Sequence, residues 1–174
     1  PDDNLQAMFD AGNKFETYAE QLFPGGVRVG FNSYDEYLSM PKRTAEVLAK
    51  GATTIFQGRF EHEQTTFICD VLQLVGDPAD KLADLIEIKS STKAELDHEL
   101  DLAGQVGVLE GCGYKVRKVS VVHVNSDYVR AGEIDARELT ATTDVTAGVM
   151  AKLEQSRRDI RAAVQVAQEA TMPN

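Results

Sequence analysis

The chain has 174 residues, 43% hydrophobic and 26% charged, a composition typical of one folded domain with a sizeable core and unlike that of a disordered chain. Its formal net charge of -10 argues against a general affinity for nucleic acid, since binding to phosphates depends on clustered Lys and Arg. No apolar run is long enough to cross a bilayer, and the two cysteines form neither a disulfide framework nor a zinc motif, so a cytoplasmic setting without a membrane is expected. The sequence starts at Pro1 without a Met, and we expect either a processed protein or a piece of a longer one with additional domains.

The hydrophobic pattern predicts eight main elements in chain order. Helical spacing predicts a first helix over residues 3–23, stopped by Pro24 and two glycines, and a second over 41–50, with Pro41 in its first turn and Gly51 as its cap. Strand-like runs follow at 54–60, 66–75 and 82–90, with a turn at 76–81. A helix over 93–110, a Val-rich strand over 118–125 and a helix over 144–170 complete the chain. This order predicts a single mixed α/β domain over residues 1–174, built around one sheet.

Three charged residues stand inside the predicted strands. Alternation of side chains directs Asp70 away from the face that holds Cys69 and Val71, and it places Glu87 and Lys89 on one face of the next strand. Charged side chains among apolar neighbours are costly unless they pair or bind a cation. These three residues therefore form a candidate site.

Two carboxylates that converge at a sheet edge suit Mg²⁺ or Mn²⁺, which prefer oxygen ligands. Asp70 and Glu87 are thus candidate metal ligands, and Lys89 is a candidate catalytic residue that orients a water for attack on a phosphodiester. Spacing alone is a weak signal, and a structural ion pair between Glu87 and Lys89 is the alternative. Apolar residues on both sides of the motif indicate a buried sheet and favour the metal site.

The same residues carry a resemblance to a known family. Asp70 and the run Glu87-Ile88-Lys89-Ser90-Ser91-Thr92 resemble the second and third motifs of the PD-(D/E)XK nuclease superfamily. The sequence is most similar to the RecB-like branch, to its CRISPR-associated adaptation exonucleases and to uncharacterised bacterial proteins with this domain. Residues 12–26 resemble the helix that precedes the sheet in that branch, residues 101–105 the helix after the lysine strand, and residues 123–129 a late strand and turn.

The resemblance implies a restriction-endonuclease-like core, a central mixed sheet of about four or five strands flanked by helices. It implies a Mg²⁺- or Mn²⁺-dependent deoxyribonuclease that acts as an exonuclease or processes DNA ends, so that nucleic acid, DNA more than RNA, is the expected partner. The backbone carbonyl of Ile88 would be a further metal ligand. Members of the adaptation branch often hold an iron–sulfur cluster on four cysteines; this sequence lacks that cysteine pattern, and no cluster is expected.

Two further polar residues are candidates. Glu16 lies within the apolar stripe of the first helix, where an unpaired carboxylate is rarely tolerated, so it is a candidate metal ligand; a pairing with Lys14 or Arg59 is the alternative. Gln105 resembles the start of a Gln-x-x-x-Tyr motif, with Leu109 in the place of the tyrosine. It is a candidate substrate contact, unless it bonds a carbonyl of the core.

Two other functions stay open. The chain could be a catalytically silent nuclease-fold module that acts in binding or assembly within a larger protein, which its acidic charge favours. It could also be an unrelated α/β domain with a chance motif, which requires Asp70 and Glu87 to lie far apart.

Overall fold

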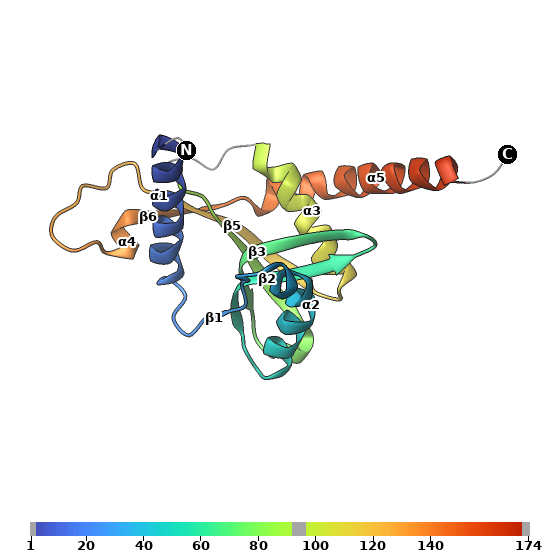
Figure 1. Cartoon of the computed structure of the whole chain (residues 1–174), viewed down its shortest axis with the longest axis horizontal. Helices are drawn as coiled ribbons and strands as arrows, with labels where there is room; N and C mark the ends of the chain where they lie inside the picture. The colour runs from blue at the N-terminus through green and yellow to red at the C-terminus, as the bar shows by residue number, and fades with distance from the viewer. Residues whose placement is uncertain (1–2, 92–96, 172–174) are drawn as a thin grey trace.

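A six-stranded mixed sheet forms the centre of the computed structural model, which describes residues 3–91 and 97–171 (Figure 1). Its strands follow the chain order and are β1 (Val27–Arg28), β2 (Thr54–His62), β3 (Thr65–Leu74), β4 (Leu82–Ile88), β5 (Lys115–Val124) and β6 (Thr140–Asp144). The helices are α1 (Asp3–Glu20), α2 (Tyr34–Ala49), α3 (Asp97–Gly111), α4 (Ala136–Leu139) and α5 (Thr146–Thr171), with a short 3-10 turn, η1 (Pro78–Asp80). β1 with β2 and β4 with β5 are parallel pairs, and the other neighbours are antiparallel.

The mixed α/β architecture is the predicted one, but the predicted number of strands is wrong: the sheet has six strands and not four or five. The two additional strands are its edges. β1 is two residues long, and β6 has the sequence Thr-Ala-Thr-Thr-Asp. Neither has an apolar alternation, and that is why the pattern gave no signal for them. Residues 93–96 of the predicted third helix lie outside the described residues.

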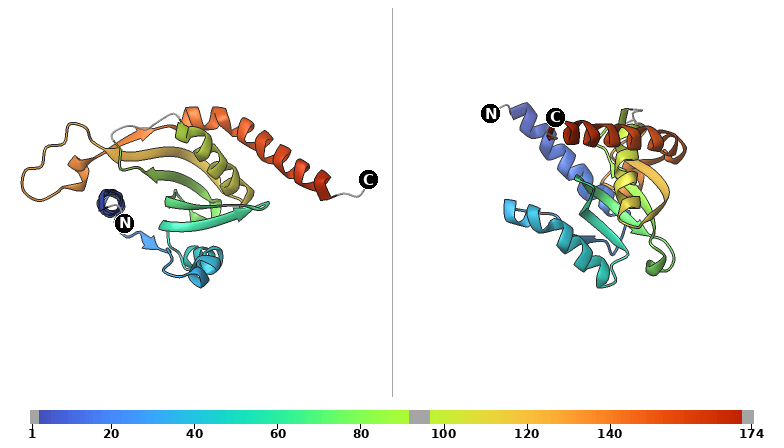
Figure 2. Two further views of the ribbon diagram at one scale, coloured as in Figure 1. Left: turned by 45° about the horizontal axis from the view of Figure 1, so that its top comes forward. Right: turned by 90° about the vertical axis from the view of Figure 1, so that its right-hand side faces the viewer.

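Helices cover both faces of the sheet and create two apolar clusters (Figure 2). The larger cluster lies under α3 and α5, and contains Leu72, Leu85 and Leu102, none more than 1% exposed. The smaller one lies under α1, and contains Phe15, Phe56, Val71, Ile86 and Val122. Each fully buried leucine contributes about 1.5–3 kcal/mol through the area it removes from water. In the described part of the chain no helix is both long and apolar enough to span a bilayer.

Side-chain alternation reverses in β2 and β3 at one pair of positions. Cys69 packs in the larger cluster and Val71 in the smaller one, so the two do not share a face as strict alternation predicted. The paired strand reverses at Gln57, whose φ of +54° lies in the left-handed region that non-glycine residues rarely adopt. Gln57 stands opposite Asp70 in the register that pairs Phe56 with Val71. The reversal therefore occurs where the candidate site begins.

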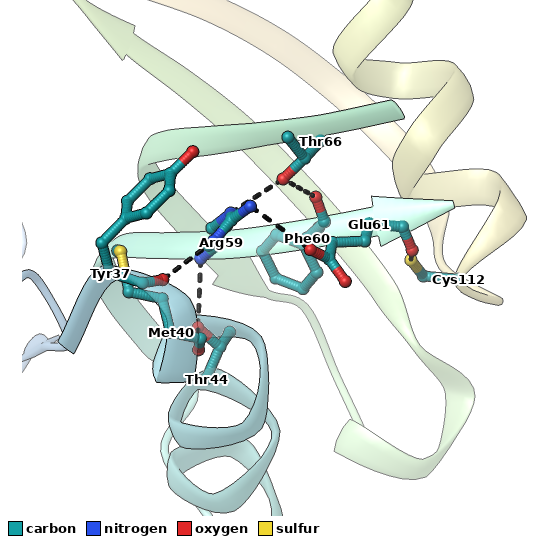
Figure 3. A network of polar contacts seen from close by, with 8 residues as sticks. All are labelled: Tyr37, Met40, Thr44, Arg59, Phe60, Glu61, Thr66 and Cys112. Carbon is teal, nitrogen blue, oxygen red and sulfur yellow. Dashed lines mark hydrogen bonds and ion pairs between the residues drawn. The ribbon is translucent and has the colours of Figure 1, made fainter. Parts of the chain in front are cut away.

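Helix α2 starts earlier than predicted, and Pro41 lies inside it rather than in its first turn. Ser33 caps the helix, since its hydroxyl accepts the backbone N–H of Glu36 at 3.1 Å. A proline has no N–H to donate, so the carbonyl four residues earlier, that of Tyr37, has no helical partner at that position. The guanidinium of Arg59 on β2 donates to this carbonyl at 2.8 Å (Figure 3). A strand side chain thus completes the hydrogen bonding of the helix.

Candidate active site

Asp70 lies on β3 at the point where its pairing with β4 ends. The last recorded pair of the two strands is Val71 with Ile86. Beyond it, a side chain replaces the backbone hydrogen bonds between the two strands: Asp70 Oδ2 accepts the backbone N–H of Ile88 at 2.8 Å. Asp70 and Glu87 are close enough for their charges to interact, which excludes the arrangement in which the motif halves lie far apart.

Gln57 joins Asp70 to helix α1. Its amide nitrogen donates both to Glu16 Oε1 at 2.7 Å and to Asp70 Oδ1 at 3.1 Å, which uses both of its protons. The partner of Glu16 is therefore Gln57, where Lys14 or Arg59 was the predicted alternative. Helix α1 also lies against the end of the β4 segment, because a Cβ added to Gly12 would be 3.7 Å from the Ser90 hydroxyl.

Glu87 and Lys89 stand at the end of β4. The Lys89 ammonium lies 3.1 Å from Glu87 Oε1, so the ion pair expected as an alternative is present. It accounts for one oxygen only, because Glu87 Oε2 is buried and has no hydrogen-bond partner within residues 3–91 and 97–171. Leaving such an atom unsatisfied costs about 1–3 kcal/mol, and more for a charged group. Lys89 is held in register by its N–H, which donates to the Val122 carbonyl at 2.9 Å.

The electrostatics of the cluster disfavour its own negative charge. Burial raises the pKa of Asp70 from its ordinary 3.8 to about 6, against the opposing effect of the Ile88 N–H, and the carboxylates of Glu16 and Glu87 raise it further. Burial also raises the pKa of Glu16, and Glu20 adds to the effect. The raised pKa values of these two carboxyl groups indicate a site that a cation would stabilise.

The residues present fit a divalent cation of the Mg²⁺ class. The unsatisfied Glu87 Oε2 and the Asp70 carboxylate are hard oxygen donors. The N–H of Ile88 points toward β3, and in a strand the carbonyl of the same residue points to the same side, so the Ile88 carbonyl faces Asp70. Within residues 3–91 and 97–171, no three His, Cys, Asp or Glu side chains are already arranged around one metal position. The reason is local, since Gln57 separates two of the carboxylates and Lys89 pairs with the third.

Gln105 lies on α3, on the side of the sheet opposite α1, where it lines a shallow pocket with Phe67 and Asp101. No hydrogen bond among the described residues joins it to Asp70 or Glu87, so its contact with a substrate stays a prediction. Sequence reasoning missed Gln57. A polar residue followed by glycine inside an apolar strand is a recognisable signal for a distortion, and the hairpin register places it opposite Asp70.

Comparisons with known proteins add little to this geometry. No family model matches the sequence, and no curated protein matches it. A solved structure that it resembles is a phage-related exonuclease from Haemophilus somnus 129PT, with 12% identity, a match over 90% of this chain and 83% of the other, and a TM-score of 0.30. A TM-score this low establishes no common fold. The structure thus defines an α/β domain with a half-buried carboxylate cluster where the pairing of β3 with β4 ends.

Proposed function

We propose that the chain is a Mg²⁺- or Mn²⁺-dependent nuclease of the PD-(D/E)XK superfamily, of its RecB-like branch, that hydrolyses phosphodiester bonds in DNA as an exonuclease or in end processing. The observation that carries the proposal is the buried Oε2 of Glu87 beside Asp70, an atom that has no hydrogen-bond partner in the described part of the chain. A buried carboxylate oxygen without a partner, close to further carboxylates, raises the free energy of the folded protein. A bound cation would remove this destabilisation. The motif residues in the sequence support the same conclusion.

Each residue of the cluster has a role in this mechanism. Asp70, Glu87 and the Ile88 carbonyl would hold the cation, which would supply a water with a lowered pKa and offset charge on the phosphate. Glu16 contributes a further negative charge near the cation, either from its place behind Gln57 or as a ligand of the cation itself. The Lys89 ammonium, one third exposed, donates a hydrogen bond to the attacking water and fixes its direction.

Cleavage of labelled single-stranded and double-stranded DNA tests the proposal. The wild type, Asp70→Ala and Lys89→Ala are compared with and without Mg²⁺ or Mn²⁺, and Asp80→Ala, a change in the exposed turn between the same strands, is the matched control. We expect cleavage by the wild type and the control, and rates at least about 10²–10³-fold lower for the other two variants. Equal rates for all four proteins would show that the cluster is not the active site.

A second candidate function is a catalytically silent module. The formal net charge of -10 and the ion pair that occupies Glu87 Oε1 favour it. Calorimetric titration with Mn²⁺ separates the two: the nuclease binds the ion at a site that Asp70→Ala abolishes, whereas the silent module binds none there.

A further inference from the structure

An exposed group of apolar side chains lies at the start of α2 and just before it. This aromatic surface consists of Phe31, Tyr34, Tyr37 and Leu38. Phe31, Tyr34 and Leu38 are 48%, 72% and 54% exposed. The rings are arranged against one another: Tyr34 is stacked on Tyr37 with centroids 6.3 Å apart and planes inclined by 22°, and Phe31 meets Tyr37 edge-on at 5.3 Å. Single exposed apolar residues are ordinary, but a contiguous set of ordered rings indicates a binding surface.

This surface is joined to the candidate site by two direct connections. The N–H of Gly30 donates to the backbone carbonyl of Gln57 at 3.1 Å, so Phe31 follows one residue after a backbone contact with the residue whose side-chain amide links the carboxylates. On the other side, the guanidinium of Arg59 lies 4.0 Å from the centroid of the Tyr37 ring. Arg59 is two residues from Gln57 along β2, a separation of about 7 Å in a strand. The aromatic surface thus lies beside the segment of β2 that holds Gln57.

Within residues 3–91 and 97–171, several cations near the site already have partners. Arg28 and Lys89 form ion pairs with carboxylates, and Arg43 and Arg59 donate to backbone carbonyls. With a formal net charge of -10, the chain offers little free positive charge to hold phosphates. A nucleic acid that reaches this site must therefore be bound mainly by its bases, and stacking on aromatic rings is the contact that accepts every base.

We propose that the aromatic surface stacks the unpaired bases of a single-stranded nucleic acid whose backbone enters the Asp70–Glu87 site. The inference rests on the proposed function, and it assigns single strands as its substrate class. Phe31 and Tyr34 provide the ring faces, and Tyr37, fixed by Arg59, supports Tyr34 from behind. A base-paired duplex keeps its bases stacked on one another and gives the rings no free face.

Binding without catalysis tests this directly. A fluorescent oligonucleotide of about 12 nucleotides, within the range of known single-strand sites, is titrated in EDTA with the wild type, Phe31→Ala and Tyr34→Ala. Val129→Ala, which removes an 83% exposed side chain from the loop after β5, far from α2, is the matched control (Figure 1). An RNA oligonucleotide of the same length shows which sugar the site prefers, and a blunt duplex measures binding without free bases.

We expect each aromatic variant to bind the single strand about tenfold more weakly than the wild type and the control, with the duplex bound weakly by all. The affinity of the wild type should change little with salt, because few counterions are released. The chain has five tyrosines and no tryptophan, so tyrosine emission reports stacking; we expect quenching on binding, reduced in Tyr34→Ala.

Several results would overturn the inference: no single-strand binding by the wild type, equal binding by Tyr34→Ala, or a preference for the duplex. Self-association that Tyr34→Ala abolishes, with oligonucleotide binding unchanged, would make the surface a protein contact instead. Binding that depends on Tyr34 in a protein that never cleaves DNA would refute the proposed nuclease and keep the stacking surface. Metal-dependent cleavage of a single strand with the same KM in Tyr34→Ala would refute the stacking surface alone.

Discussion

Two polar assemblies stand side by side on β2 and β3, and they differ in how completely their groups are paired. Arg59, only 8% exposed, is fully engaged: its guanidinium contacts the Tyr37 carbonyl, the Thr66 hydroxyl and Glu61 (Figure 3). Two residues away along the strand, the cluster around Asp70 holds excess negative charge and leaves Glu87 Oε2 without a partner.

The difference separates structural from functional polarity. A buried guanidinium that is paired with protein acceptors stabilises one conformation, and the binding of a ligand would bring it no further stabilisation. A buried carboxylate cluster that is short of positive charge is unfavourable by itself and becomes favourable when a cation binds. We therefore expect the Arg59 network to control stability and the Asp70 cluster to control metal binding.

The largest effect should follow from removal of the Arg59 charge. Arg59→Met keeps much of the side-chain volume but leaves the Tyr37 carbonyl without its donor, and we expect the free energy of unfolding to fall by about 3 kcal/mol. Urea denaturation measures this. Arg161→Met, which breaks an exposed ion pair with Glu154, is the control, with an expected change of about 0.5 kcal/mol or less. Equal losses of stability in the two variants, or a loss of Mn²⁺ affinity in Arg59→Met, would contradict the assignment of stability to the Arg59 network and of metal binding to the Asp70 cluster.

The Arg59 network stabilises the fold, whereas the charged form of Asp70 should destabilise it, and the pH dependence of stability should show this. In EDTA, the folded protein binds a proton at Asp70 between about pH 4 and 6 that the unfolded chain does not bind, because the folded pKa is about 6 against an ordinary 3.8. The free energy of unfolding therefore falls as pH rises through this window. Asp70→Asn removes this proton uptake. We expect its free energy of unfolding, relative to that of the wild type, to be about 2 kcal/mol higher at pH 7 than at pH 4.

Urea denaturation of both proteins at pH 4, 5 and 7 measures the difference, and the carboxyl groups outside the cluster cancel in the comparison. Addition of Mn²⁺ at pH 7 should stabilise the wild type and leave Asp70→Asn unchanged, since only the former binds the ion at this site. Parallel pH profiles in EDTA would mean that Asp70 is not disfavoured in its charged form.

The smallest effect concerns the start of α2, which the Arg59 network and the aromatic surface share. Ser33→Ala removes the acceptor for the Glu36 N–H, and we expect a loss of about 1 kcal/mol in the free energy of unfolding. Ser33→Gly is the matched control, because glycine at a cap costs only a few tenths of a kcal/mol. Thermal melts of both variants and of the wild type measure this, and a Ser33→Ala protein as stable as the wild type would show that the cap contributes nothing.

The central part of the fold and of the site could be predicted because burial marks it in the sequence. Asp70 and Glu87 are each surrounded by apolar strand residues, and the structure places them on neighbouring strands where the pairing of β3 with β4 ends. Glu16 was singled out as a carboxylate inside an apolar stripe, and it does join the cluster through Gln57.

What could not be predicted depends on backbone conformation and on contacts distant in sequence. The left-handed φ of Gln57 and the reversal of alternation beside it follow no hydrophobic period. The extension of α2 past Pro41 was missed because a proline is read as a helix start, and the donor that makes its interior position acceptable comes from Arg59, eighteen residues later. Edge strands β1 and β6 exist through pairing alone.

Pro41 has a consequence for how the chain assembles. An ordinary helix closes its own hydrogen bonds before it meets the rest of the protein, but α2 has one acceptor that only β2 can satisfy. Complete formation of this helix and docking of the β2–β3 hairpin are therefore a single cooperative event. Exchange of amide protons in α2 should then be as slow as in the hairpin, and the two segments should open together.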